Sequence, residues 1–266
     1  MPRSAAVSVD DTDSRTQVID RVSRIFAVLA RQGSDGVRLV DLAREASIPR
    51  PTAHRLLQDL MSVGYVRQVE QRRYALGSAL FSLGMSAPNP IRSIRGIHQA
   101  AQALSDQSGD TVYVSIRHFN GVHYIVRTDG RFPIRTYAAN VGETVPFLNT
   151  YSGIVLLAAM GAKAEARELS RWERDRNDMW GAQDPEVHLA QLKGALHQAR
   201  TEGYVYGANF YVPTIAGVAI PVPPRSGPPY VAVSISAVES RLPLERVASL
   251  RAQMEVTARR IASFAD

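Results

Sequence analysis

The residues best suited to chemistry lie in the stretch IPRPTAHRLLQDLMSVGYV, residues 48–66. Thr52, His54, Arg55 and Gln58 fall on one side of a helical projection, and the leucines between them fall on the other. Short polar groups and a guanidinium on one exposed helix face suit hydrogen bonding to base edges in the major groove of DNA. An ordinary solvated helix face has a similar composition, so this segment alone leaves both interpretations open.

The start of this predicted helix suits an anionic partner. Arg50 precedes Pro51, and proline fits the first helical turn because its missing N–H would have no partner there. Backbone amides and a guanidinium at a helix N-terminus form a place where a phosphate can be held. Residues 48–75 carry five arginines against two acidic residues, which makes this segment a local basic patch.

The neighbouring patterns predict the elements that position this helix. Apolar residues at helical spacing predict a first helix over residues 16–32 and a second over 39–47. After Gly64, the segment YVRQVEQRRYALG predicts two short strands around a polar turn. Helix, helix, tight turn, helix and hairpin is the order of a winged helix-turn-helix, which we assign to residues 16–77. Residues 1–15 are polar and acidic, and we expect a disordered tail there.

The predicted DNA contacts come from the third helix and the hairpin. They are Arg50, Thr52, Ala53, His54, Arg55, Gln58, Arg67, Arg72 and Arg73. Ala53 lies in the first turn, although its spacing also matches the apolar face of the helix. The hairpin arginines fit contacts to phosphates or to the minor groove, but Arg73 equally fits a surface position at a strand end. The expected partner is double-stranded operator DNA.

Residues 78–90, SALFSLGMSAPNP, predict a linker helix followed by a proline-rich hinge. Beyond it, residues 91–266 are expected to form a second domain. A helix is predicted over 91–109, strands over 111–119, 122–129, 132–140, 215–222 and 229–236, and helices near 151–160, 163–176, 185–201 and 244–264. Asn120 and Gly121 are the expected turn between the first two strands. This order predicts an α+β fold, an antiparallel sheet with helices packed on one face.

Composition limits the classes of protein that the chain can belong to. The 266 residues, 45% of them hydrophobic, can form two domains that each bury a core. Cysteine is absent, which excludes disulfides and thiolate sites and suits a reducing cytoplasm. No apolar segment is long enough to predict a membrane span or a secretion signal. The net charge of +6 fits a polyanionic partner.

Several motifs, in order, resemble the IclR family of bacterial transcriptional regulators. They are PTAHRLLQDLMSVGYVRQ, RRYALGSALFSLG, VGETVPFLNTYSGIVLLA, TEGYV, AGVAIPV and VAVSISAVESR. The resemblance covers nearly the whole chain, from residue 16 to residue 264. It implies an N-terminal winged helix-turn-helix that binds operator DNA, a linker helix, and a C-terminal GAF-like antiparallel sheet domain with helices. That domain binds a small effector, usually an organic acid or aromatic compound, in a dimer or tetramer, and the protein needs no cofactor.

The resemblance also implies an effector pocket. Carried over onto this chain, and extended to a nearby aromatic residue, the pocket comprises Asn149, Thr150, Tyr151, Ser152, Gly153, Phe210, Gly217, Ser234 and Ser236. The residue types agree, because amides at a helix start suit a carboxylate and alternate serines in a strand face one side. The alternative is an ordinary helix cap beside a half-exposed strand.

The chain departs from the family pattern at three positions. Pro51 replaces a small hydroxyl residue, so the cap or phosphate bond from that side chain is lost. Gly207 and Gly217 stand where some members have an aspartate and a cysteine near the ligand. Aromatic residues surround this gap, namely Tyr204, Tyr206, Phe210 and Tyr211. We therefore expect a roomier, more aromatic pocket that favours an aromatic or bulky acid over a very small one.

Two histidines could in principle share a metal ion. His118 and His123 flank the expected turn and should form a cross-strand pair, with Cβ atoms roughly 5 Å apart. No acidic or cysteine ligand is nearby in sequence, so we expect an exposed hairpin and no metal site.

Two other classes of function compete with regulation. One is an enzyme acting on a small carboxylate, although no nucleophile elbow, H-E-x-x-H, P-loop or G-x-G-x-x-G motif occurs. Missing motifs do not exclude a catalytic triad assembled in space. The other is a DNA-binding protein without a ligand, which would not need so large a second domain.

Overall fold

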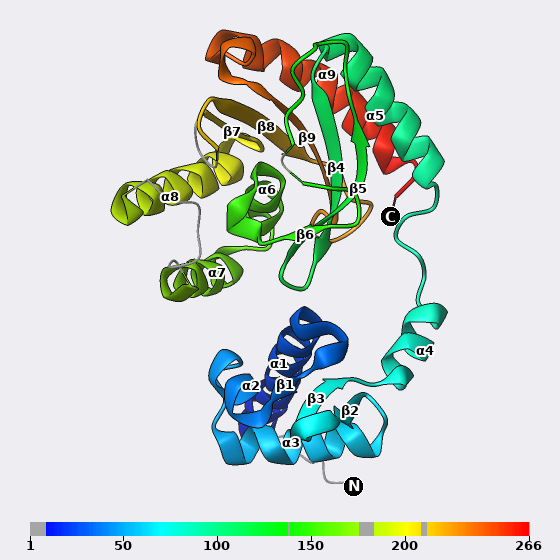
Figure 1. The fold of residues 1–266 in the computed structure, drawn as a ribbon, viewed down its shortest axis with the longest axis vertical. Coiled ribbons are helices and arrows are strands. Elements are labelled where there is room, and N and C mark those ends of the chain that lie inside the picture. The colour runs from blue at the N-terminus through cyan, green and yellow to red at the C-terminus, as the bar shows by residue number, and fades with distance from the viewer. Residues whose placement is uncertain (1–8, 138, 176–183, 209–211, 266) are drawn as a thin grey trace, which may run out of the picture. The chain divides into compact units, whose positions relative to one another are not determined.

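The computed structural model describes residues 9–137, 139–175, 184–208 and 212–265 (Figure 1). The contacts divide the chain into two compact units, residues 1–88 and 89–266. The division falls within the expected hinge, between Pro88 and Asn89. Each unit has its own buried core and its own antiparallel sheet.

The first unit has the order of a winged helix-turn-helix. It contains α1 (Val9–Gln32), η1 (Gly33–Asp35), β1 (Val37–Arg38), α2 (Leu39–Glu45), α3 (Arg50–Ser62), β2 (Val66–Val69), η2 (Glu70–Arg72), β3 (Arg73–Leu76) and α4 (Ser78–Ser86). The three strands pair in the order β1-β3-β2. Ile25, Leu29, Leu42 and Leu57 are fully buried where the first three helices meet. The order predicted from apolar spacing is confirmed.

Helix α1 begins at Val9, seven residues before the predicted start of the first helix at residue 16. Residues 9–15, for which the sequence predicted a disordered tail, are thus assigned to a helix. Residues 1–8 of the expected tail lie outside the described part of the chain.

The second unit is built around a six-stranded antiparallel sheet. Its strands are β4 (Thr111–His118), β5 (Gly121–Thr128), β6 (Thr144–Val145), β7 (Val205–Ala208), β8 (Ile215–Pro221) and β9 (Val231–Val238), in the order β6-β5-β4-β9-β8-β7. Its helical elements are α5 (Ile94–Ser108), η3 (Phe147–Asn149), α6 (Tyr151–Ala158), α7 (Ala162–Asp175), α8 (Pro185–Glu202), η5 (Glu239–Arg241) and α9 (Leu244–Ala262).

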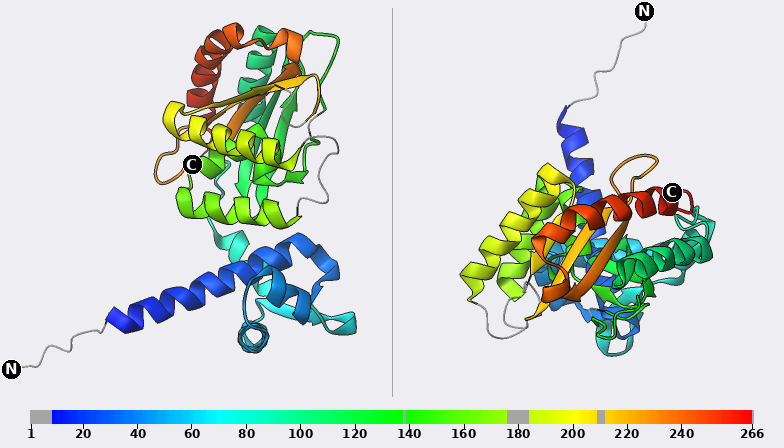
Figure 2. Two further views of the ribbon diagram at one scale, coloured as in Figure 1. Left: turned by 90° about the vertical axis from the view of Figure 1, so that its left-hand side faces the viewer. Right: turned by 90° about the horizontal axis from the view of Figure 1, so that it is seen from above.

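Helices cover both faces of this sheet, so the prediction of helices on one face is wrong. Figures 1 and 2 show α5 and α9 on one face and α6, α7 and α8 on the other. Strand β9 shows why, because Val233 and Ile235 pack in the α5–α9 core while Ala232 packs in the α6–α8 core. Small residues on the face that α6, α7 and α8 cover let α6 approach the sheet closely. Some of these small residues are polar, so the sequence pattern alone indicated that this face is exposed to solvent.

The segment 132–140 was predicted as a strand, but its described residues do not join the sheet. It is held instead by hydrogen bonds through Thr136. Tyr113 donates its hydroxyl proton to the Thr136 carbonyl at 2.8 Å, and the Thr136 hydroxyl donates to the Ser236 carbonyl at 3.1 Å. Pro133 also lacks the N–H that a ladder needs. These contacts compete successfully with strand pairing.

The β4–β5 hairpin turns one residue earlier than predicted. The turn residues are Phe119 and Asn120, and Gly121 is the first residue of β5. Glycine is required there because a Cβ atom would collide with the carbonyl oxygen of Val145 on β6. The glycine thus serves strand approach rather than turn geometry.

No helix in the described ranges is both long and apolar enough to span a membrane.

Candidate DNA-binding surface and effector site

Helix α3 presents a polar face and buries an apolar one. Ala53, Leu56, Leu57 and Leu60 are buried in the core of the first unit. His54, Arg55 and Gln58 are exposed on the opposite side, and Thr52 is partly exposed. The buried residues fix the helix as a rigid rod, so its exposed side chains project from a defined position.

The turn between α2 and α3 is tightly held. Ser47 takes the left-handed conformation at φ 52°, and the Ile48 amide donates to the Ala43 carbonyl at 2.9 Å. Arg24 of α1 donates to the Ala46 carbonyl at 2.9 Å, which ties the turn to the first helix. These bonds set the angle at which α3 leaves the core.

The first turn of α3 has no side-chain cap. Its N-cap residue is Pro49, whose side chain has no polar atom, and Arg50 is exposed beside it. The prediction of DNA contact through Ala53 is wrong, since its side chain is fully buried and its amide donates to the Pro49 carbonyl at 2.9 Å. Its helical spacing had already placed it on the apolar face.

The β2–β3 hairpin forms the wing. Arg67 and Arg72 are exposed, and Arg72 lies in the turn with φ 56°. Gln71 beside it has the same φ of 56°, so two non-glycine residues adopt the left-handed region at the tip. Arg73 is half-buried and donates to the Gly36 carbonyl at 3.4 Å, which anchors the wing to the core.

The start of α6 and strand β9 bring together several predicted effector residues. Thr150 is the N-cap of α6, and its Oγ1 lies 2.6 Å from the hydroxyl of Tyr124. The hydroxyl of Ser152 donates to that of Ser234 at 3.0 Å, and both residues are buried. The result is a set of buried hydroxyls between α6 and the sheet.

The remaining predicted residues lie close to this set. Asn149 is half-buried in η3, where its backbone N–H donates to the Pro146 carbonyl at 3.0 Å. Ser236 is buried two residues along β9 from Ser234, so both lie on the α6 face. Gly153 has a packing role, because a Cβ atom there would collide with the Phe147 backbone. Phe210 lies outside the described residues.

The expectation of a roomier pocket at the two glycines is wrong. A Cβ atom on Gly217 would overlap the ring of Tyr151, which therefore occupies the space that a larger side chain would take. The Tyr151 hydroxyl also donates to the Gly207 carbonyl at 3.0 Å. One aromatic ring from α6 thus fills the gap that the glycines leave.

Tyr204, just before β7, and Tyr206 within it face the wrong side for an effector pocket. Tyr204 and Tyr206 both pack against the α5–α9 core. The Tyr204 ring stacks under Arg251 with the Arg251 Cζ 3.9 Å from its centroid, and the Tyr206 hydroxyl donates to the Leu242 carbonyl at 2.9 Å. Strand alternation places them opposite Val205. Tyr211 lies outside the described residues.

The α6 face is aromatic for another reason, which the sequence analysis missed. Tyr113 of β4 and Tyr124 of β5 lie edge to face, with ring centroids 5.4 Å apart. Both are buried beside the hydroxyl set, and burial raises the pKa of Tyr124 to about 12. The alternation in TVYVSIRH could have placed Tyr113 opposite Val112 and Val114, but only strand pairing brings Tyr124 beside it.

The two histidines of the hairpin are not cross-strand partners. His118 pairs with Gly121, and His123 pairs with Ile116. The ring centroids lie 6.2 Å apart, and each Nδ1 is already bonded, to Asn120 and to Thr144. The described residues contain no group of three or more metal-binding side chains.

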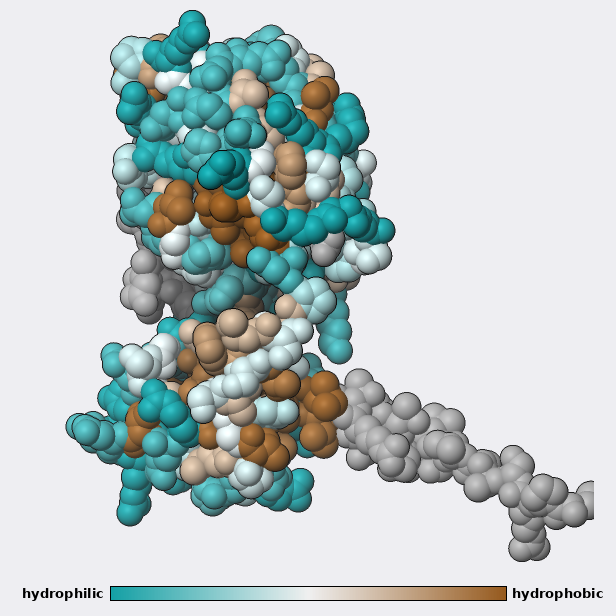
Figure 3. All heavy atoms as spheres, turned by 90° about the vertical axis from the view of Figure 1, so that its right-hand side faces the viewer, coloured by the Kyte–Doolittle hydropathy of each residue, from teal (hydrophilic) through white to brown (hydrophobic). Residues whose placement is uncertain are grey.

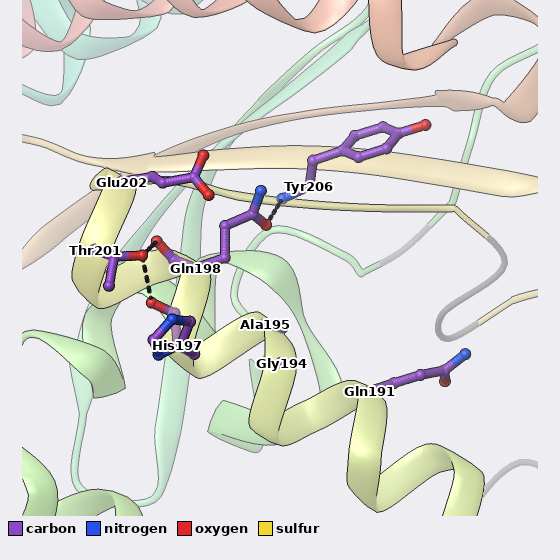
Figure 4. Close-up of a pocket in the computed structure, with 8 residues that line it drawn as sticks. All are labelled: Gln191, Gly194, Ala195, His197, Gln198, Thr201, Glu202 and Tyr206. Carbon is purple, nitrogen blue, oxygen red and sulfur yellow. Dashed lines mark hydrogen bonds between the residues drawn. The ribbon is translucent and has the colours of Figure 1, made fainter.

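A shallow groove lies on the exposed side of α8 (Figure 4). It is lined by Gln191, Gly194, Ala195, His197, Gln198, Thr201, Glu202 and Tyr206. Gln198 accepts the Tyr206 amide proton at 3.1 Å, so α8 caps a backbone donor of the edge strand β7. This arrangement protects a sheet edge and contains none of the predicted effector residues.

A basic winged helix-turn-helix joined to a separate α+β unit with a buried polar face defines the class of protein. It is a DNA-binding regulator with a separate α+β domain. Two family models match the chain, the IclR helix-turn-helix domain over residues 18–70 and the bacterial transcriptional regulator IclR C-terminal domain over residues 91–263. The chain belongs to the IclR family of transcriptional regulators.

Known relatives agree with this assignment. The chain is 26% identical to the HTH-type transcriptional regulator KdgR of Escherichia coli, over 95% of each chain. It is 25% identical to the transcriptional repressor IclR of the same organism, over 97% of this chain and 93% of that one. An IclR homolog of Microbacterium hydrocarbonoxydans, solved with 4-hydroxybenzoate, has a TM-score of 0.53 at 20% identity, covering 91% of this chain and 99% of that one. The two Escherichia coli relatives are transcriptional regulators, and the likeness to the solved structure supports the fold.

Proposed function

We propose that the exposed face of α3 reads operator DNA in the major groove, with Arg55 contacting base edges and Arg67 and Arg72 contacting the backbone or minor groove. The observation that carries this proposal is the polar face of α3, which is exposed while the opposite face is anchored in the core. The partner is double-stranded operator DNA, so the protein acts in the bacterial cytoplasm.

Removing Arg55 tests the reading face. Arg55→Ala should weaken binding to the promoter DNA of its own gene by on the order of 1–3 kcal/mol, because it removes a charge-assisted contact. Gel-shift titration measures this, and wild-type binding should weaken steeply as salt rises. Arg95→Ala, an exposed position in the second unit, serves as the matched control. Equal affinity of Arg55→Ala and wild type would remove Arg55 from the interface.

We also propose that the protein is a homodimer or homotetramer that places paired winged helices on a palindromic or repeated site. Helix α4 supports this, because Phe81, Leu83 and Met85 are 72%, 53% and 73% exposed. Figure 3 shows the side that carries α4, with apolar side chains grouped on the first unit. An apolar group of this kind marks a protein interface. Light scattering should show that the wild-type protein is an oligomer and that Phe81→Ser shifts it toward the monomer. A monomeric wild-type protein would exclude the proposed oligomer.

The second domain, in this proposal, binds a small organic acid on the α6 face of its sheet. Buried hydroxyls of Ser152, Ser234 and Ser236, together with the amides at the start of α6, supply polar partners in a largely apolar setting. The structural neighbour solved with 4-hydroxybenzoate supports an aromatic acid as the class of effector.

A double substitution in β9 tests the effector face. Ser234→Ala with Ser236→Ala should weaken the effect of added acids on operator binding and leave binding without acid unchanged. Ser170→Ala, at an exposed position, is the control. A gel-shift with and without metabolites also separates classes, since an enzyme would consume the ligand. Loss of all DNA binding in the double variant would mean that it misfolds.

The entrance of the chain into the second unit suits the coupling that this proposal requires. Ile91 forms an antiparallel bridge with Ala265, and the Arg92 amide donates to the Phe264 carbonyl at 2.8 Å. The Phe264 ring packs on Gly96 so closely that a Cβ atom there would overlap it. A shift of the helices on the sheet would therefore move the linker, and effector binding would bias the spacing or orientation of the paired winged helices.

A further inference from the structure

Arg127, which no motif singled out, lies on the same face of the sheet as the buried serines. It stands in β5 opposite Tyr113 of β4, and Tyr113 stands opposite Ser234 of β9. The three residues form one row across adjacent strands, and their side chains rise on the α6 face. Two inter-strand spacings separate Arg127 from Ser234, about 10 Å between Cα atoms.

The guanidinium of Arg127 is held in place but is not saturated. Its side chain is 13% exposed, and its Nη2 donates to Asp129 at 3.0 Å. Its Cζ lies 3.9 Å from the ring centroid of Tyr137 and 5.9 Å from that of Tyr113. The Nε is buried and has no hydrogen-bond partner among the described groups. A ligand carboxylate would supply the missing acceptor.

The opposite end of the row offers hydroxyls. Ser234 and Ser152 bond to each other there, and the Oγ of Ser115, one row further along the same face, is buried without a hydrogen-bond partner in the described structure. Tyr113 lies between the two ends of the row, and the Tyr124 ring from the next row packs edge to face against it. A cation, an aromatic ring and a group of hydroxyls along one row complement a rod-shaped aromatic acid with a polar group opposite its carboxylate.

We propose that Arg127 binds the carboxylate of the effector and that the effector is an aromatic acid of this shape. The inference rests on the proposed effector role of the second domain, and it moves the carboxylate from the α6 amides to Arg127. The ring lies against Tyr113, and the distal hydroxyl reaches the Ser152–Ser234 pair. Tyr137, which is 72% exposed, leaves the guanidinium as the acid enters. Acids of two or three carbons are too short to reach both ends.

Calorimetric titration of the full chain tests the assignment. The ligands are 4-hydroxybenzoate, 4-hydroxyphenylacetate, pyruvate and the neutral 4-hydroxybenzamide. At least one hydroxyaryl acid should bind, and more tightly than pyruvate or the amide. Arg127→Gln should weaken that acid by about 30-fold, as expected for the loss of a charge-assisted bond, without changing amide binding. Arg135→Gln is the control, since Arg135 is 61% exposed and pairs with the same Asp129.

Arg127→Lys keeps the assignment testable if Arg127→Gln fails to melt cooperatively. Lysine retains the charge but lacks the planar fork, so binding of the acid should weaken while folding is preserved. Unchanged acid binding in the variant that folds, tighter binding of pyruvate, or no binding of either hydroxyaryl acid would overturn the proposal. Gel-shifts with the same acids separate it from the proposed function, because acid binding without a change in DNA affinity refutes only effector control.

Discussion

Replacing Gly217 by alanine should destabilise the second unit through one identifiable collision. The added methyl group would overlap the Tyr151 ring, which must move and give up its hydrogen bond to the Gly207 carbonyl. Overpacking costs about 1–3 kcal/mol, and a lost hydrogen bond costs about 0.5–1.5 kcal/mol. Together these terms lower the free energy of unfolding by about 2–4 kcal/mol.

Urea unfolding followed by tryptophan fluorescence measures this change. Both tryptophans, at positions 172 and 180, lie in the 89–266 part of the chain, so the signal reports on the second unit. The control is the same substitution in a Tyr151→Ala background, where the methyl group has space. There, Gly217→Ala should cost less than about 1 kcal/mol, which gives a coupling energy of at least about 1 kcal/mol between the two positions. An equal cost in both backgrounds would refute the collision as the cause.

Two further predictions concern a buried phenol and the wing. Burial raises the pKa of Tyr124 from 10.0 to about 12, so the folded state holds the phenolic proton more tightly than the unfolded state. The stabilisation of the folded state by this proton is complete below pH 10 and is lost as the pH rises from about 10 to 12. The loss amounts to roughly 2–3 kcal/mol, and alkaline absorbance titration of wild type against Tyr124→Phe should show one late-titrating phenol missing in the variant. Gln71→Gly should raise the free energy of unfolding of the first unit by up to about 1 kcal/mol, because glycine adopts the left-handed conformation of residue 71 without strain. Gln68→Gly in strand β2 should lower the same free energy by about 0.5–1 kcal/mol. Thermal melts followed by circular dichroism compare the two variants. If both variants were more stable than wild type, or neither were, strain at Gln71 would not be the cause.

Local patterns were sufficient wherever an element interacts mainly with its chain neighbours. The spacing of Leu56, Leu57 and Leu60 placed the polar side chains of α3 outward, and the structure confirms this face. Strand alternation likewise placed Ser234 and Ser236 on one side of β9. The same reasoning failed for the strand predicted over 132–140, because the competing bonds to Thr136 come from β4 and from a residue 100 positions away.

The amino-acid pattern by itself determined the winged helix-turn-helix, the α+β class of the second domain and the family, since these depend on helical and strand periodicity along continuous segments. Only the tertiary structure decided what surrounds the effector face. It put the Tyr151 ring against Gly217, turned Tyr204 and Tyr206 to the other side, and aligned Arg127 with Ser234. Periodicity specifies which face a side chain occupies, whereas strand order and register, set by contacts between distant segments, specify its neighbours.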